Sequence, residues 1–265
     1  MNKYVIYTVL IGGYDNVLDP LVNNELIDFI CFVGKGESIL HKSEVWKFVE
    51  IDSAINDNGR VSRIPKILPH KTIISDYEYS LYIDANILIK DKYIFERLFN
   101  LASSETRIAL LQHPFRDCVY QEAYVCIASL KGGWLDILKQ ICFLKWKKIP
   151  KHNGLYEANV IFRKHNDSKI VFMDELWWKT FMNYSKRDQL SLVYAIKESN
   201  VQVSYFLTPG QTTRNHFAFE KTAHLTMKQK KQNKIKKCII NNISKVSRKI
   251  LKENYGQNFH CDGSL

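Results

Sequence analysis

The composition of this 265-residue chain excludes several classes of protein. Hydrophobic residues make up 46% and charged residues 25%, with only 11 Gly and 6 Pro, so disorder, a fibrous repeat and a disulfide-stapled miniprotein are excluded. The formal net charge is +11, but residues 221–253 hold eleven Lys or Arg against a single acidic residue, Glu253. The rest of the chain is close to neutral, and the electrostatic signal therefore lies in one C-terminal segment.

The ends and the cysteines indicate a soluble or peripheral protein. Residues 4–11 form a short apolar run that stops at two glycines, which predicts a first strand and not a signal peptide. No stretch approaches the roughly 18 to 20 apolar residues of a membrane span. Six cysteines without a CxxC pair predict reduced structural thiols in a cytosolic setting.

Apolar runs rich in β-branched and aromatic residues alternate with helical patterns along the first 220 residues. Strands are predicted at 4–10, 28–33, 46–51, 79–89, 108–112, 156–163 and 201–207. Helices are predicted at 93–103, 172–184 and 188–198, with one or two more within 122–144, interrupted at Gly132-Gly133. Short strands spaced in this way predict an α/β domain over residues 1–220, followed by a separate tail over residues 221–265.

The tail has the pattern of a basic amphipathic helix. Its apolar residues fall at 235, 239, 243, 246 and 250 among lysines, which places them on one helix face. The pattern fits a solvated helix that caps the core, or an anchor whose lysines meet the headgroups of an anionic membrane surface. Nucleic acid is a third partner class, disfavoured because no recognised reader motif accompanies the charge.

Two oxygen-bearing side chains, Asp84 and Asn86, interrupt the strand predicted at 79–89. In a continuous strand they point to the same side. Mg²⁺ and Mn²⁺ take one or two such protein ligands and complete their shell with phosphate oxygens and water. The pair therefore predicts a metal and diphosphate site at a strand end, unless it forms an ordinary turn. His216, beyond the last strand, is a candidate third metal ligand.

Basic residues precede this strand, and a polar cluster follows the strand at 108–112. Four of the basic residues recur at helical spacing, where they face either a diphosphate or solvent: Arg60, Arg63, Lys66 and His70. The polar cluster either contacts an acceptor or forms loop hydrogen bonds, and it comprises His113, Arg116 and Glu122.

Acidic and aromatic residues in the last third of the domain are further candidates. Asp188 is the first choice for a general base that takes a proton from an acceptor hydroxyl, although its position also suits a helix N-cap. Glu157 is the second carboxylate of this kind. Trp177 and Trp178 either stack on a sugar or pack in the core, and Arg187 flanks Asp188.

In chain order, these motifs resemble one family. They are Ile6-Tyr7-Thr8, Gly13-Tyr14-Asp15, residues 63–70, Tyr82-Ile83-Asp84-Ala85-Asn86, His113-Pro114, Glu122-Ala123, Gly154-Leu155-Tyr156-Glu157 and Arg187-Asp188-Gln189-Leu190-Ser191. Over roughly residues 4–217 the set resembles the bacterial relatives of the plant TOD1/MUCI70 glycosyltransferase-like domain. The basic tail lies outside the resemblance.

The resemblance implies a GT-A fold, a nucleotide-sugar donor and a metal motif of the DxD type. Asp84 and Asn86 carry that motif, with Mn²⁺ or Mg²⁺ as cofactor, and Asn86 in the second acidic position predicts weaker metal binding. The implied donor contacts are Thr8, Gly13, Tyr14, Asp15, Arg63, Lys66, His70, Asp84 and Asn86. The implied sugar and acceptor contacts are Glu157, Asp188, His113, Arg116, Glu122, Trp177 and Arg187.

The expected function is transfer of a hexose from a UDP-linked donor to a glycan or lipid-linked acceptor. Enzymes of this appearance build surface polysaccharides such as lipopolysaccharide or capsule, so we expect a cytoplasmic protein, peripheral on the inner face of the cell membrane. Two other classes remain open: a module that binds a nucleotide or glycan without catalysis, and a nucleic-acid-binding protein that acts through the tail.

Overall fold

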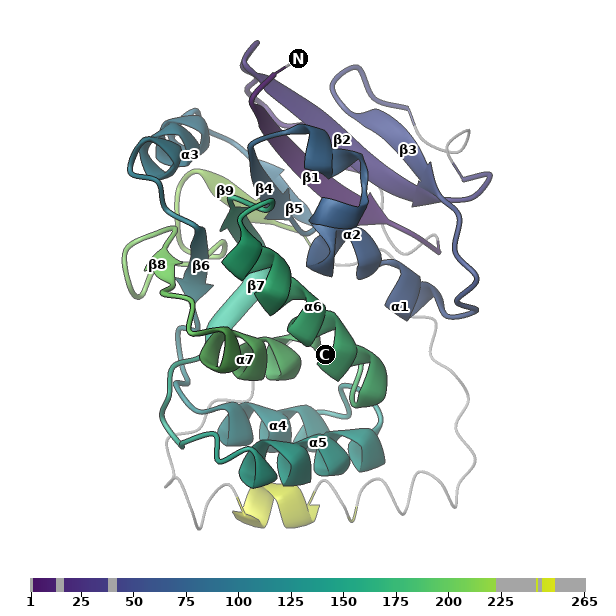
Figure 1. Cartoon of the computed structure of the whole chain (residues 1–265), viewed down its shortest axis with the longest axis vertical. Helices are drawn as coiled ribbons and strands as arrows, with labels where there is room; N and C mark the ends of the chain where they lie inside the picture. The colour runs from purple at the N-terminus through teal and green to yellow at the C-terminus, as the bar shows by residue number, and fades with distance from the viewer. Residues whose placement is uncertain (1, 13–16, 38–41, 223–241, 243–244, 251–265) are drawn as a thin grey trace.

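The computed structural model describes residues 2–12, 17–37, 42–222, 242 and 245–250. Within these ranges a seven-stranded sheet has the strand order β3-β2-β1-β4-β7-β6-β8 (Figure 1). The strands are β1 (Tyr4–Leu10), β2 (Ile27–Gly34), β3 (Lys47–Ile51), β4 (Tyr79–Ile83), β6 (Ile108–Gln112), β7 (Tyr156–Arg163) and β8 (Ser204–Tyr205). The α/β fold class expected from the sequence is confirmed.

The direction of β7 determines which residues meet at one edge of the sheet. Strands β1 to β4 are parallel to one another, whereas β7 is antiparallel to both β4 and β6. The N-terminal end of β7 therefore lies beside the carboxyl end of β4, with the carboxyl end of β1 one strand further along the same edge. Just past the last β4–β7 pair, the backbone N–H of Asp84 donates to the carbonyl of Asn159 at 2.9 Å. We call this side of the sheet the carboxyl edge.

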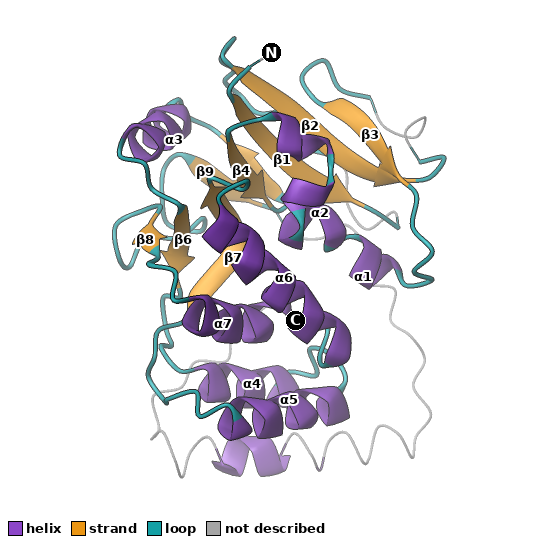
Figure 2. Ribbon diagram, in the orientation of Figure 1, coloured by secondary structure: helices purple, strands orange, loops and turns teal. Residues whose placement is uncertain are grey.

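Helical elements cover both faces of the sheet, as Figure 2 shows. They are α1 (Asn58–Val61), α2 (Ile64–Ile67), η2 (Pro69–Lys71), η3 (Ile73–Asp76), α3 (Tyr93–Ser103), α4 (Val119–Ala128), α5 (Trp134–Trp146), α6 (Ser168–Asn183) and α7 (Asp188–Ser199). On one face, Leu98 of α3 belongs to the same core as Ile6 of β1. On the other, Trp177 of α6 shares a core with Tyr7. Because both faces of the sheet are buried, the sequences of β1 and β2 are nearly continuous in apolar residues.

A third apolar core joins α4, α5 and α7 beyond the end of the sheet. Ile127 of α4, Ile141 of α5 and Leu190 of α7 are buried in it. The helical segment predicted at 122–144 is thus two helices, and the break falls at Gly132, whose φ of +105° is strained for any other residue. The pair α4 and α5 extends the molecule at one end (Figure 1).

The strand predicted at 79–89 is wrong, because the chain turns at Asp84. The backbone N–H of Ile87 donates to the carbonyl of Asp84 at 3.0 Å, closing a turn. Beyond it β5 (Ile87–Ile89) leaves the large sheet and pairs with β9 (Phe219–Lys221). Asp84 and Asn86 are therefore turn residues, and the argument that strand alternation aligns them does not hold.

Two further boundaries differ from the sequence-based expectation. The helix predicted at 172–184 begins earlier, at Ser168, because the side chain of Asp167 accepts the N–H groups of Lys169 and Ile170 as an N-cap. The last predicted strand, at 201–207, shortens to β8, Ser204–Tyr205.

Of the predicted basic tail, the structure describes only a small part. Residues 245–250 are helical, with Val246 58% exposed and Ser247 buried. The apolar positions 235, 239 and 243 lie outside the described residues. None of the helices in the described ranges is long and apolar enough to cross a membrane.

Burial of His165 predicts a loss of stability in acid. Its side chain is fully buried, and this burial, with the nearby positive charge of Arg163, lowers its pKa from 6.5 to about 4. Between these values the unfolded chain binds a proton that the folded chain does not. The free energy of unfolding should therefore fall by up to about 3 kcal/mol as the pH is lowered through this range.

Urea unfolding of the wild type and of His165→Gln, compared from about pH 7 to about pH 4, measures this contribution. The variant should lose part of the acid sensitivity. His152→Gln serves as control, because the side chain of His152 is 55% exposed. Equal pH dependence of the wild type and His165→Gln would contradict the prediction.

Candidate functional site

The carboxyl edge gathers charged side chains from elements far apart in the sequence. Asp84 comes from the turn after β4, Lys66 from α2, and Asp188 from the first position of α7. A carboxyl edge of this kind is where α/β sheets place their ligands.

Lys66 is the centre of this cluster. Its Nζ lies 2.7 Å from Oδ2 of Asp188 and 3.4 Å from Oδ1 of Asp84, and only 4% of its side chain is exposed. The carbonyl of Lys66 accepts a hydrogen bond from the buried guanidinium of Arg163 at 2.5 Å. The short helix α2 is therefore held to the sheet, and an ammonium group is fixed between two carboxylates.

Asp188 is held ionised by two cations. Nε of Arg63 lies 3.2 Å from the same Oδ2 that binds Lys66. Burial raises the pKa of Asp188, but the charges of Lys66 and Arg63 outweigh it and hold the pKa well below its usual range. The indole N–H of Trp177 donates to the carbonyl of Asp188 at 2.8 Å, which fixes the start of α7.

Asp84 is partly open to solvent, with 34% of its side chain exposed. The hydroxyl of Tyr82 donates to its Oδ1 at 2.7 Å. Burial, together with the charge of Asp84, raises the pKa of Tyr82 well above its ordinary value, so that the phenol remains a donor. We name Lys66, Arg63, Asp84 and Asp188 the Lys66 cluster.

An apolar pocket adjoins Asp84. Its lining includes Thr8 of β1 and the ring of Trp46, with apolar side chains from the two β-sheets and the loop before β2: Val17, Leu18, Ile83, Ala85, Ile87 and Ile89. The Oγ1 of Thr8 is buried and has no hydrogen-bond partner among the described residues. Asp84 also lines this small pocket, so that its carboxylate stands between the apolar side chains and Lys66.

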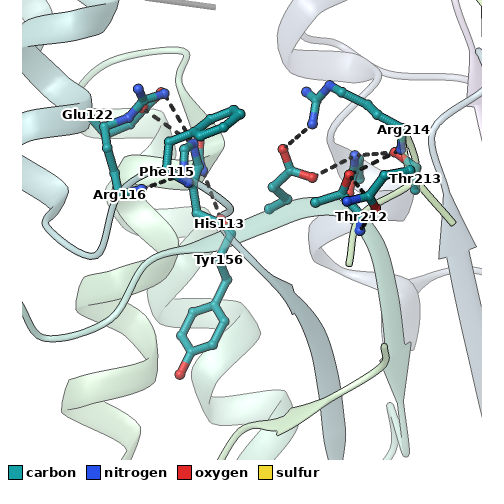
Figure 3. Close-up of polar contacts among 12 residues, drawn as sticks. His113, Phe115, Arg116, Glu122, Tyr156, Thr212, Thr213 and Arg214 are labelled. Atoms are coloured by element: carbon teal, nitrogen blue, oxygen red, sulfur yellow. Dashed lines mark hydrogen bonds and ion pairs between the residues drawn. The ribbon is translucent and has the colours of Figure 1, made fainter. Parts of the chain in front are cut away.

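A second polar group lies at the start of β7 (Figure 3). The guanidinium of Arg214 donates to Oε1 of Glu157 at 2.7 Å, and the amide of Asn159 donates to Glu157 at 3.4 Å and to Thr213 at 3.3 Å. The loop 212–214 is therefore bound to the same edge of the sheet as Asp84. The carbonyl of Asn159 accepts a hydrogen bond from the N–H of Asp84 at this edge.

The predicted cluster of His113, Arg116 and Glu122 forms at the start of α4 (Figure 3). Nε of Arg116 donates to Oε2 of Glu122 at 2.7 Å, and its Nη2 lies 3.1 Å from Nε2 of His113. Arg187 interacts electrostatically with both Glu122 and Asp188. The cluster is thereby linked to the Lys66 cluster through Arg187.

Two of the four basic residues predicted to face a diphosphate lie elsewhere. Arg60 donates to the carbonyls of Phe181 and Met182 at the end of α6, where a cation offsets the unpaired carbonyls of a helix terminus. His70 pairs with Glu175 of α6 at 3.1 Å. Only Arg63 and Lys66 reach the carboxylates of the site.

Trp177 is corrected from a sugar contact to a positioning residue. Its side chain is fully buried, so neither face of the indole is available for stacking on a sugar. The predicted contacts Gly13, Tyr14 and Asp15 lie outside the described residues.

Two of the three metal ligands expected from the sequence have contacts with other parts of the chain. His216 packs on Tyr93 with ring centroids 5.0 Å apart, and its Nδ1 accepts the N–H of Ala218, while the amide of Asn86 donates to the carbonyl of Thr222 at 3.1 Å. Across the described residues no group of three or more His, Cys, Asp or Glu side chains is arranged to hold a metal. Asp84 alone fits Mg²⁺ or Mn²⁺ bound through one carboxylate and phosphate oxygens.

Sequence reasoning missed three residues of the site: Tyr82, Asn159 and Arg214. Tyr82 lies within the Asp84 motif, where a hydroxyl two residues before the carboxylate was the available signal. No sequence pattern near Asn159 or Arg214 indicates a site. Both contact Glu157 because β7 runs antiparallel to β4 and because the loop 212–214 returns to the start of β7.

The fold and the site define an α/β protein that presents paired carboxylates and cations at the carboxyl edge of a mixed sheet. The chain belongs to the TOD1/MUCI70 glycosyltransferase-like domain family, whose model matches residues 22–224. It is therefore a glycosyltransferase-like protein, as the sequence motifs indicated.

Comparison with solved structures finds glycosyltransferases. The crystal structure of mouse xyloside xylosyltransferase 1 in its apo form has a TM-score of 0.46 at 8% identity, over 76% of this chain and 84% of that chain. The apo structure of the bifunctional glycosyltransferase WbbM has a TM-score of 0.43 at 8% identity, over 77% of this chain and 38% of that chain. No curated protein matches the sequence.

Proposed function

We propose that this chain transfers a sugar, a hexose carried on UDP, from a nucleotide-diphosphate donor to a glycan or lipid-linked acceptor. The observation that carries the proposal is the Lys66 cluster, in which two cations and two carboxylates meet beside an apolar pocket. Lys66 and Arg63 suit the diphosphate of a nucleotide donor, and Thr8 lies in the pocket beside Asp84. Membership in a glycosyltransferase-like family supports the same reaction class.

In the proposed mechanism Lys66 and Arg63 stabilise the departing diphosphate. Cleavage of the bond between sugar and phosphate develops negative charge on the leaving group, which preorganised cations stabilise better than water does. A diphosphate would compete with Asp188 for both cations. Release of Asp188 would let its pKa rise and make it a better base toward the acceptor hydroxyl, with Glu157 as the alternative base.

The proposed cofactor is Mn²⁺ or Mg²⁺ held by Asp84. When bound there, a divalent cation would neutralise charge on the diphosphate. We propose that the acceptor binds on the α4 and α7 side of the site. The side chains that would contact it there are His113, Arg116, Glu122 and Arg187.

The proposed setting is the cytoplasmic face of a membrane, in the synthesis of a surface polysaccharide. The charge of residues 221–253 supports it, because eleven basic residues in one segment attract anionic headgroups. The same charge would attract nucleic acid, a partner that predicts binding with a steep dependence on salt.

Nucleotide binding by Asp84→Asn tests the donor site. Thermal unfolding of the wild type with a panel of nucleoside diphosphates should show stabilisation of several degrees by one of them, when it is supplied at about 100 times its Kd with Mn²⁺. The stabilisation should be strongly reduced in Asp84→Asn, since a neutral amide oxygen binds a divalent cation more weakly than a carboxylate does.

Asp52→Asn is the matched control, because the side chain of Asp52 is 73% exposed in a surface ion pair. Release of free nucleoside diphosphate on adding donor and acceptor separates a transferase from a module that only binds. Absence of any nucleotide effect, with or without metal, would contradict the donor site.

A further inference from the structure

The outward face of α5 is apolar where a solvent-facing helix is ordinarily polar. Leu135 is 54% exposed, Leu138 37% and Trp146 72%, and Cys142 between them is exposed as well. Their spacings of three, four and four residues place them in one stripe along the helix. Large side chains are thus gathered on one exposed face and are not scattered singly over the surface.

The opposite face of α5 is already buried in the protein. Ile137, Gln140, Ile141 and Leu144 lie in the interior, and the three apolar ones share a core with α4 and α7. This inner face supplies the buried contacts of α5, while the side chains of the outward stripe stay exposed. A helix that is apolar on two opposite faces is expected to have a partner on each.

Lysines surround the outward stripe. Lys139 and Lys145 are exposed on its two sides, and Lys148 is exposed just past the end of α5. Over residues 131–151 there are six lysines and one acidic residue, Asp136. Nζ of Lys147 lies 4.7 Å from the centre of the Trp146 ring. An ammonium group and an indole are therefore in contact on this surface.

We propose that the outward face of α5 binds the surface of an anionic lipid bilayer. Leucines and Trp146 would enter the headgroup region, where indoles are favoured, and the lysines would meet anionic headgroups. Two-fold self-association is disfavoured, because it would bring the lysines of one copy against those of another. A nucleic acid offers phosphates to the lysines but nothing to Leu135 and Leu138.

The position of α5 suits this role. Figures 1 and 2 show α4 and α5 at one end of the molecule, away from β3, and the helical residues 245–250 lie toward the same end. Glu122 of the His113, Arg116 and Glu122 cluster belongs to α4, and α4 shares an apolar core with α5. Binding of α5 to a membrane would bring the site near a lipid-linked acceptor. Only this benefit rests on the proposed function, which the inference deepens.

Vesicle binding by the full chain tests the proposal. The wild type and the triple variant Leu135→Ser, Leu138→Ser, Trp146→Ser are mixed with vesicles of phosphatidylcholine alone or with added phosphatidylglycerol, without donor or acceptor. We expect binding to the anionic vesicles, weakened about tenfold or more in the triple variant. Circular dichroism checks that the variant is folded.

The matched control is Leu21→Ser, Leu26→Ser, Phe172→Ser, which removes three exposed apolar side chains elsewhere on the surface. It should bind as the wild type does. A second variant, Lys139→Gln with Lys145→Gln, should lose affinity for the anionic vesicles and show a weaker dependence on salt. A blue shift of tryptophan emission on binding, smaller in Trp146→Phe, would place this indole in the bilayer.

Three results would overturn the proposal. They are wild-type affinity in the triple variant, loss of binding only when Lys228, Lys230 and Lys231 of the tail are changed to Ser, and a dimer in solution that the triple variant abolishes. Because no donor is present, vesicle binding is separable from transfer. Activity on a soluble acceptor should persist in the triple variant if the proposed function is right, whatever the vesicles show.

Discussion

Replacing Lys66 by methionine is expected to lower kcat/KM for glycosyl transfer by about 100-fold or more. Methionine preserves most of the buried stem but removes the ammonium that lies 2.7 Å from Asp188 and 3.4 Å from Asp84. Two neighbouring carboxylates would then face an incoming diphosphate with Arg63 as the remaining cation of the cluster. Repulsion should weaken donor binding, and the departing group should lose one of the charges that stabilise it.

Steady-state kinetics with varied donor measures the effect, and the thermal shift with nucleoside diphosphate measures binding without chemistry. Lys35→Met is the matched control: Lys35 has an ion pair of 2.8 Å with Asp52, but 72% of its side chain is exposed. Exposed pairs of this kind contribute little. If the Lys66→Met enzyme had the donor KM and kcat of the wild type, Lys66 would have no part in donor binding or transfer.

Replacing Arg163 by methionine is expected to lower the free energy of unfolding by about 3 to 5 kcal/mol. Its guanidinium is fully buried and donates to both oxygens of Asp174, at 3.0 and 3.1 Å. Nη2 also donates to the hydroxyl of Tyr7 at 2.8 Å and to the carbonyl of Lys66. The variant would leave a buried carboxylate without its cation and would release the anchor of α2.

Urea unfolding followed by circular dichroism gives the free energy. Arg107→Met is the control, since its pair with Asp167 has a similar length of 2.9 Å, but 53% of the Arg107 side chain is exposed, so that a much smaller change is expected. The double variant Arg163→Met, Asp174→Leu should recover part of the loss, because it removes the unpaired charge. Equal losses in Arg163→Met and Arg107→Met would contradict the assignment.

The two variants also separate two functions of one buried network. Lys66 contacts the site through its side chain and the interior through its carbonyl, which Arg163 holds. Lys66→Met should therefore affect transfer more than stability, and Arg163→Met the reverse. Partial loss of activity in Arg163→Met below its unfolding temperature would indicate that the position of α2 matters for the reaction.

Much of the fold could be predicted because its signals are local. The runs at 4–10, 108–112 and 156–163 are rich in apolar and β-branched residues, and their strands form where predicted. The helix at 93–103 is likewise confirmed. Predictions failed where one segment changes partner: residues 79–89 are mostly apolar on both sides of Asp84 and Asn86, but a turn at Asp84 divides them between two sheets.

The sequence by itself determined the α/β class, the family through ordered motifs, and Asp84, Arg63, Lys66 and Asp188 as candidates. Only the tertiary structure decided which of these residues meet. Arg60, Arg63, Lys66 and His70 have equivalent spacing in the chain, yet two face α6 and two face Asp188. Spacing specifies direction only within one regular element, and these residues span three short ones whose orientation depends on packing against the sheet.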